Sequence, residues 1–116
     1  MSKTSEIKFT VHLDENHVPE KIDWFAEDGD VSNACKSVLI AIWDEKEKNT
    51  LRMDLWNKEM TVDEMKHFFH QNLMTMADTF ERATAEKEMS QDMRDFAIYF
   101  ADKMELIDSE SGAGEQ

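Results

Sequence analysis

The hydrophobic period of this chain changes at Thr61, and that change constrains the fold more than any other feature. Before Thr61, short runs alternate apolar and polar residues, as in "EIKFTVHL", whose apolar members are Ile7, Phe9, Val11 and Leu13. After Thr61, apolar residues recur every three to four positions. A period of two is typical of half-buried strands, and a period near 3.6 is typical of amphipathic helices. Strands followed by helices predict an α+β fold.

The first half predicts an antiparallel sheet of about four strands over residues 5–57. The second expected strand is "KIDWFA", which follows a turn near Pro19. The run "SVLIAIWD" is nearly all apolar, which is typical of a central strand buried on both faces. The segment "TLRMDLW" alternates again, so the charged "DEKEKN" before it is expected to be a hairpin loop. We expect "EDGDVSNACK" to be a connection that allows a helical turn near Asn33.

The second half predicts two helices, at about 61–84 and 90–106. The segment "TVDE" forms a capping box, in which Thr61 and Glu64 satisfy each other's backbone amides. Ser90 is a candidate cap for the second helix. We expect both helices to pack on one face of the sheet; in the alternative, the second helix packs on a partner subunit. The predicted apolar stripes are Val62, Met65, Phe69, Leu73, Met76 and Phe80, and then Met93, Phe96, Ala97, Phe100 and Met104.

Length, composition and charge limit the class of protein. With 116 residues, of which 41% are hydrophobic and 34% charged, the chain suits a single domain over residues 1–107, followed by a flexible acidic tail at 108–116. The net charge of −13 is shared by both halves, which disfavours binding to nucleic acid or to an anionic membrane. Cys35 is the one cysteine, so no internal disulfide can form. Without a membrane-spanning run or a signal-like segment, we expect a cytoplasmic protein.

The best candidate for a metal site is the pair His67 and His70, with Asp63 one helical turn earlier. Such a pair could begin a zinc site, but no H-E-x-x-H motif, cysteine pair or clear fourth ligand accompanies it. Both histidines lie at the border of the apolar stripe or beyond it, which favours boundary or solvent-facing positions. We therefore expect no metal, no cofactor and no catalytic residue. Cys35 is interpreted as a small buried hydrophobic residue, with a reactive thiol as the alternative.

Nine methionines are many for a chain of this length. Most fall on predicted core faces, where they fill space between other side chains. The alternative is an adaptable, methionine-rich binding groove in which Met74 and Met89 are exposed.

A tryptophan stands at each end of the predicted hairpin, at Trp43 and Trp56. A loop with an even number of residues would place Leu51, Met53 and Leu55 on the same face as Val38, Ile40 and Ile42. Both tryptophans would then lie with Leu39 on the opposite face, where we predict a surface that binds a partner or a second copy of the chain. In the alternative, the loop after Trp24 or the aliphatic stems of lysines cover this face. A loop with an odd number would turn Trp43 inward and leave only Trp56 outside. We prefer the even loop because it gives the better core. Tryptophan is enriched at binding hot spots.

Four segments of the chain resemble the gliding motility-associated protein GldC family. They are "TVHLDENHVPEKIDW", "CKSVLIAIWDEKEKNTLRMDLW", "KEMTVDEMKHFFHQ" and "MADTFERAT", and the likeness runs from about Ser5 to about Leu106. The resemblance implies a small protein that supports surface gliding, without enzyme activity or cofactor, and it assigns no binding residues.

We expect a non-enzymatic accessory or adaptor protein that acts through contacts with a protein of the gliding machinery. A homodimer is a further option. The alternative is a small metal-dependent enzyme or regulator that uses the region of His67 and His70.

Overall fold

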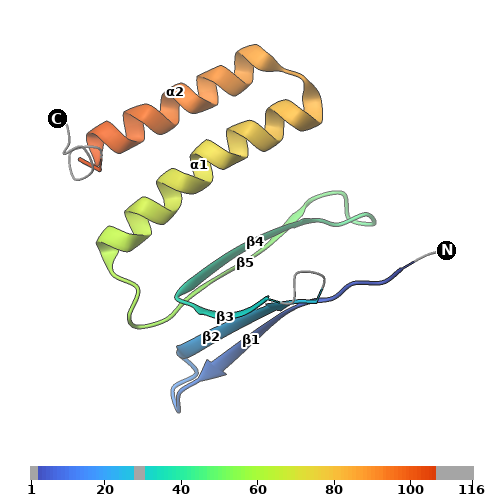
Figure 1. Ribbon diagram of the computed structural model, residues 1–116, viewed down its shortest axis with the longest axis vertical. Helices are drawn as coiled ribbons and strands as arrows, with labels where there is room; N and C mark the ends of the chain where they lie inside the picture. Colours follow the sequence, from blue (N-terminus) through green and yellow to red (C-terminus); the bar gives the residue numbers. More distant parts are fainter. Residues whose placement is uncertain (1–2, 28–30, 107–116) are drawn as a thin grey trace. The chain divides into compact units, whose positions relative to one another are not determined.

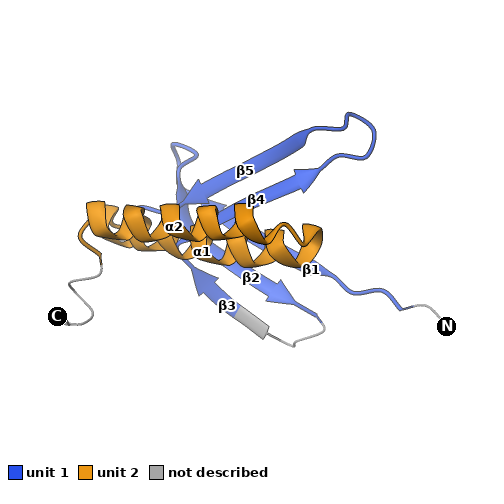
Figure 2. Ribbon diagram, turned by 90° about the horizontal axis from the view of Figure 1, so that it is seen from above, with its two compact units in different colours: residues 1–60 blue, residues 61–116 orange. Residues whose placement is uncertain are grey.

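The computed structural model describes residues 3–27 and 31–106, and it confirms the predicted α+β class (Figure 1). The predicted tail at 108–116 lies outside the described residues. The chain divides into two compact units, residues 1–60 and 61–116 (Figure 2). A single domain over 1–107, and helices packed on one face of the sheet, stay predictions. The elements are β1 (Ile7–Leu13), β2 (Pro19–Ala26), β3 (Val31–Cys35), β4 (Ser37–Trp43), β5 (Thr50–Trp56), α1 (Val62–Thr84) and α2 (Lys87–Lys103).

The first unit contains a three-stranded antiparallel sheet with β2 in the centre, between β1 and β3. The strands β1 and β2 were expected, but the helical turn near Asn33 was wrong. Asn33 instead lies in β3, opposite Trp24 of β2. The segment has no alternation of apolar and polar residues. It is a strand because its backbone pairs with β2, and such pairing does not depend on the pattern of side chains.

The remaining strands, β4 and β5, form a separate two-stranded sheet. Val38 pairs with Leu55, Ile40 with Met53 and Ile42 with Leu51, and six residues, 44–49, form the loop. The predicted hairpin and its even loop are therefore confirmed. A central β4 buried on both faces was wrong, because β4 has one neighbouring strand and both Ile42 and Trp43 are exposed.

The turn between β1 and β2 is held by Asp14. Its carboxylate accepts hydrogen bonds from the amides of Asn16 and Val18 at 2.8 and 3.0 Å. Its second oxygen lies 2.6 Å from Nζ of Lys58, just beyond β5. The bond from Lys58 and the amide of Val18 are the main causes that lower the pKa of Asp14 from 3.8 to about 2. Asp14 thus ties the first sheet to the segment that follows the hairpin.

We expect Asp14 to stabilise the fold in a pH-dependent way. Because its folded pKa is depressed, the contribution is fully present above pH 3.8 and is lost as the pH falls towards 2. Asp14→Asn should lower the urea midpoint at pH 7, and the difference from wild type should vanish near pH 2. Glu15→Gln is the matched control, since Glu15 has no ion-pair partner among the described residues. A difference that is independent of pH would contradict this role of Asp14.

The first helix begins as the capping box predicts. The amide of Glu64 donates to Oγ1 of Thr61 at 3.0 Å, and the amide of Thr61 donates to Oε1 of Glu64 at 3.0 Å. The helix α1 ends at Thr84, beside the predicted boundary, and the left-handed Ala85 follows. Ser90 does not cap α2, which begins at Lys87.

We expect Thr61→Ala to destabilise the helical unit by about 0.5–2 kcal/mol, because the third helical amide loses its acceptor. Thr61→Ser keeps the hydroxyl and should cost much less. Urea unfolding followed by the helical circular dichroism band measures both variants. An unchanged midpoint for Thr61→Ala would remove the capping box as a source of stability.

Small residues line the contact between the two helices, which run side by side (Figure 1). Ala77 of α1 is buried, as are Ser90, Ala97 and Ala101 of α2. Such residues allow the two backbones to approach closely. The hydroxyl of Ser90 donates to the carbonyl of Glu86 at 2.7 Å, so this buried polar group is satisfied.

The predicted apolar stripes are only partly buried. Ala97 is fully buried, but Val62, Phe69, Met76 and Phe96 are exposed. That the sheet covers these four residues stays a prediction. A helical period identifies the apolar face of a helix, but not what covers that face.

Candidate protein-binding surfaces

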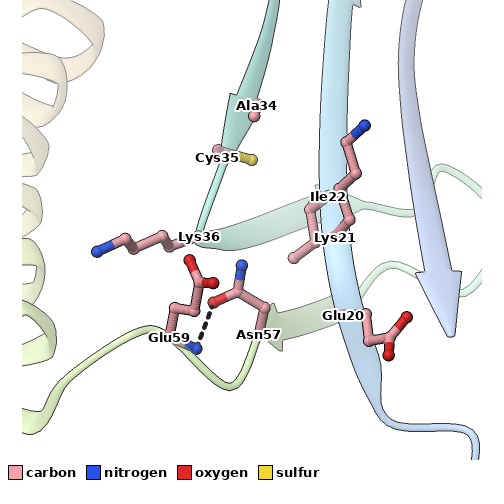
Figure 3. A pocket seen from close by; sticks show the side chains of 8 residues that line it. All are labelled: Glu20, Lys21, Ile22, Ala34, Cys35, Lys36, Asn57 and Glu59. Carbon is pink, nitrogen blue, oxygen red and sulfur yellow. Dashed lines mark hydrogen bonds between the residues drawn. The ribbon is translucent and has the colours of Figure 1, made fainter. Parts of the chain in front are cut away.

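One pocket lies within the first unit, around Cys35 at the end of β3 (Figure 3). It has a volume of about 430 Å³, and charged side chains of both signs lie among its lining residues. Oδ1 of Asn57 accepts from the amides of Glu59 and Met60 at 3.0 and 3.1 Å, which holds the wall of the pocket. The lining residues are Glu20, Lys21, Ile22, Ala34, Cys35, Lys36, Asn57 and Glu59.

The chemistry of this pocket does not favour nucleophilic catalysis. Burial raises the pKa of the Cys35 thiol, the nearby Asp23 acts in the same direction, and the amide of Ser37 opposes them. The thiolate is the nucleophilic form, so this environment makes Cys35 less reactive. No histidine is among the residues that line the pocket.

The predicted histidine region forms a pair rather than a cluster. Nε2 of His67 lies 3.8 Å from Oδ2 of Asp63, one turn earlier on α1. Within residues 3–27 and 31–106, no three His, Cys, Asp or Glu side chains are grouped so that they could hold a metal ion. The metal-dependent alternative therefore gains no support from the geometry of His67 and His70.

One face of the hairpin carries both tryptophans, as the even loop requires. Trp43 is 67% exposed and Trp56 is 53% exposed, while Leu39 is half-buried. Trp56 pairs with Ser37 and Trp43 pairs with Thr50, so the indoles stand at opposite ends of the hairpin. Residue 37, opposite Trp56, is six residue steps from Trp43. At about 3.3 Å for each step along a strand, the two indoles are roughly 20 Å apart.

Charged residues lie between the two tryptophans on this face. Nη2 of Arg52 is 2.8 Å from Oδ1 of Asp54, and these residues pair with Ala41 and Leu39 of β4. Leu39 pairs with Asp54, which is two residues from Trp56 along β5. Trp43 pairs with Thr50, which is six residues from Trp56. The face therefore has an aromatic residue at each end and an ion pair in the middle, rather than one continuous apolar patch.

A second surface, in the helical unit, is an apolar groove between α1 and α2. Its volume is about 290 Å³, and its lining residues are Leu73, Met76, Met89, Asp92, Met93 and Phe96. Met89 is exposed, as the methionine-groove alternative expected, whereas Met74 is half-buried and is not in the lining. Met76 was predicted to be a core residue from its helical spacing. That spacing does not predict that Met76 lines a groove.

The opposite side of the helical pair carries an ion-pair network. Arg94 of α2 donates to Oδ1 of Asp78 at 3.0 Å and to Oε1 of Glu81 at 2.7 Å, both on α1. The two carboxylates raise the pKa of the guanidinium. These contacts cross-link the helices and occupy the charged groups, so this side is interpreted as structural.

In the described part of the chain, neither helix is both long enough and apolar enough to cross a bilayer.

Comparison with known proteins points to one family. No curated protein and no solved structure matches the chain. The family model described as "Gliding motility-associated protein GldC-like" matches residues 19–106, which is well over half of the 116 residues. This match agrees with the resemblance found in the sequence, and the chain belongs to the GldC-like family of gliding motility-associated proteins.

Proposed function

We propose that this protein is a non-enzymatic adaptor of bacterial gliding that works in the cytoplasm through protein contacts. Membership of the GldC-like family supports the link to motility. The observation that carries the proposed mechanism is the exposure of Trp43 and Trp56 on one face of the hairpin. Leu39 lies on the same face, and together these three residues form the proposed partner-binding face.

The energetics of exposed indoles support this role. Tryptophan buries a large area on binding and often dominates the binding energy of an interface. The separation of roughly 20 Å between Trp43 and Trp56 matches the span of a standard protein interface better than that of a small ligand. Arg52 and Asp54 between them can form the polar contacts that fix the orientation of a partner.

The residues with catalytic potential give little support to an enzyme. The pKa of Cys35 is raised by burial, and among the described residues the His67 pair with Asp63 includes no third group of the metal-binding type.

The test replaces both tryptophans with serine in a gliding bacterium that carries this gene. We expect the Trp43→Ser, Trp56→Ser variant to be made at normal levels and to fail to restore gliding to a deletion strain, because the partner loses its two anchors. The matched control is Ile7→Ser, which changes another exposed apolar strand residue on a different sheet. Full gliding with the double variant would refute the proposed face, and full gliding of the deletion strain would refute the proposed function.

A further inference from the structure

The groove between α1 and α2 has the features of a site for a helical segment. Two exposed methionines, Met76 and Met89, flank it from different helices, and Met93 and Phe96 continue it along α2. The lining on α2 extends from Met89 to Phe96, which corresponds to about two helical turns. Thioether side chains are flexible and polarizable, so they adapt to apolar side chains of different shapes.

The charge around the groove is acidic and unneutralised. Asp92 is the only charged residue in the lining, and Glu88 precedes it by one turn of α2. Neither carboxylate has a hydrogen-bond or ion-pair partner among the described residues. Like charges four residues apart on a helix repel each other, so a cation placed here would relieve that repulsion. By contrast, Asp78 and Glu81 on the other side of the helices already share Arg94.

We propose that this groove binds a basic amphipathic helix of a partner protein. The partner would place apolar side chains, spaced at i, i+3 or i+4 and i+7, against Met76, Met89 and Phe96. It would place a lysine or arginine at the border of its apolar face, opposite Asp92 and Glu88. This is the helix-in-groove mode of recognition, in which an apolar stripe supplies affinity and border charges set the orientation.

A second copy of this chain fits the groove less well than a basic partner. The chain carries a net charge of −13, and residues 61–116 contain 13 acidic and 5 basic groups. Joining two such grooves would bring the carboxylates of Asp92 and Glu88 towards further carboxylates, with no cation to separate them. Charge complementarity therefore favours a cationic helix.

The inference rests on the proposed function only in that the protein acts through protein contacts; it uses a different surface from the tryptophans. The probe is a fluorescent peptide of about 18 residues, long enough to be partly helical, with leucines in one stripe and lysines along its border. A matched peptide has glutamate at every lysine position. Fluorescence anisotropy with the full chain at low salt should give at least about tenfold tighter binding of the lysine peptide.

Substitutions in the groove locate the site. Met76→Gln with Met89→Gln keeps side-chain size but removes apolar contact, and should weaken binding about tenfold. The matched control is Met53→Gln, because Met53 on β5 is 55% exposed while Met76 and Met89 are both 53% exposed. Circular dichroism checks that each variant stays folded.

The charge is tested separately, with a variant that leaves the apolar lining intact. Asp92→Asn should weaken binding of the lysine peptide roughly three- to fivefold, and added salt should remove that difference. Asp102→Asn is the control, because it removes the same charge from α2 about 15 Å further along the helix. The Trp43→Ser, Trp56→Ser variant should bind the peptide like wild type, which separates this proposal from the proposed hairpin face.

Four results would overturn the inference. Equal affinity for the lysine and glutamate peptides, or no binding of either, would remove the basic helix as the occupant. Equal losses for Met53→Gln and the groove variant would show that the peptide binds elsewhere. Light scattering that finds a dimer in wild type and a monomer in the groove variant would make a second copy the occupant.

Discussion

Replacement of Ile22 by alanine should destabilise the first unit by about 2–5 kcal/mol, the largest effect expected for any single substitution considered for this protein. Ile22 is fully buried in the central strand β2, where it pairs with Val11 on one side and Cys35 on the other. Truncation removes apolar contacts and leaves a cavity that the flanking strands cannot close without breaking their register. A loss of this size is a large part of the stability of a typical domain.

Tryptophan fluorescence is the appropriate probe, because Trp24, Trp43 and Trp56 all lie in residues 1–60. Urea unfolding of Ile22→Ala should show a much lower midpoint, or no folded baseline at all. Ile7→Ala is the control, since Ile7 is in the neighbouring strand and is 68% exposed. It should cost less than about 1 kcal/mol. Equal losses at the two sites would mean that Ile22 is not the centre of this core.

Local pattern was sufficient wherever local interactions decide the structure. The capping box at Thr61 and Glu64 needs no distant residue, so its sequence signature identified the start of α1. The hairpin register followed from the same kind of argument. The even loop was preferred because it gives the better core, and the structure has the six-residue loop. These elements are determined within a few residues of chain.

Local pattern failed where a distant partner decides. The strand β3 contains Ser32 and Asn33, and no alternation marks it as a strand. It is a strand because β2 offers a free edge, which is information that the segment itself does not hold. The run in β4 is apolar enough for a central strand, yet periodicity alone cannot count its neighbours.

Ser90 shows that a serine near the start of a helix can be either a cap or a small buried residue. A serine before an apolar helical pattern is a good cap, and that is the position predicted for it. In the structure the left-handed Ala85 ends α1 and the next helix begins at Lys87, so Ser90 lies one turn inside α2. Its small size then matters more than its hydroxyl, because it is fully buried where the helices touch.

The tryptophan face could be predicted from the sequence, whereas the groove between α1 and α2 could not. The two tryptophans are rare residues at hairpin ends, so the sequence itself singled them out. Met76 and Met93 looked like ordinary core residues, and only the structure shows that they line a groove with Asp92. Burial depends on which elements are neighbours, and a single helical period carries no record of them.

Ala97→Leu should destabilise the helical pair by about 1–3 kcal/mol, because overpacking forces close-packed helices apart. Ala97 is fully buried in α2, and Ala77 of α1 is also fully buried. Leucine has nearly the helix propensity of alanine, so a loss reports packing rather than helix formation. Ala83→Leu is the control: Ala83 is exposed near the end of α1, and the change should stay within about 0.5 kcal/mol. The helical circular dichroism band in urea measures both variants. If Ala97→Leu matched this control, the small residues would not set the helix separation, and the ion pairs of Arg94 with Asp78 and Glu81 would have to hold the helices together.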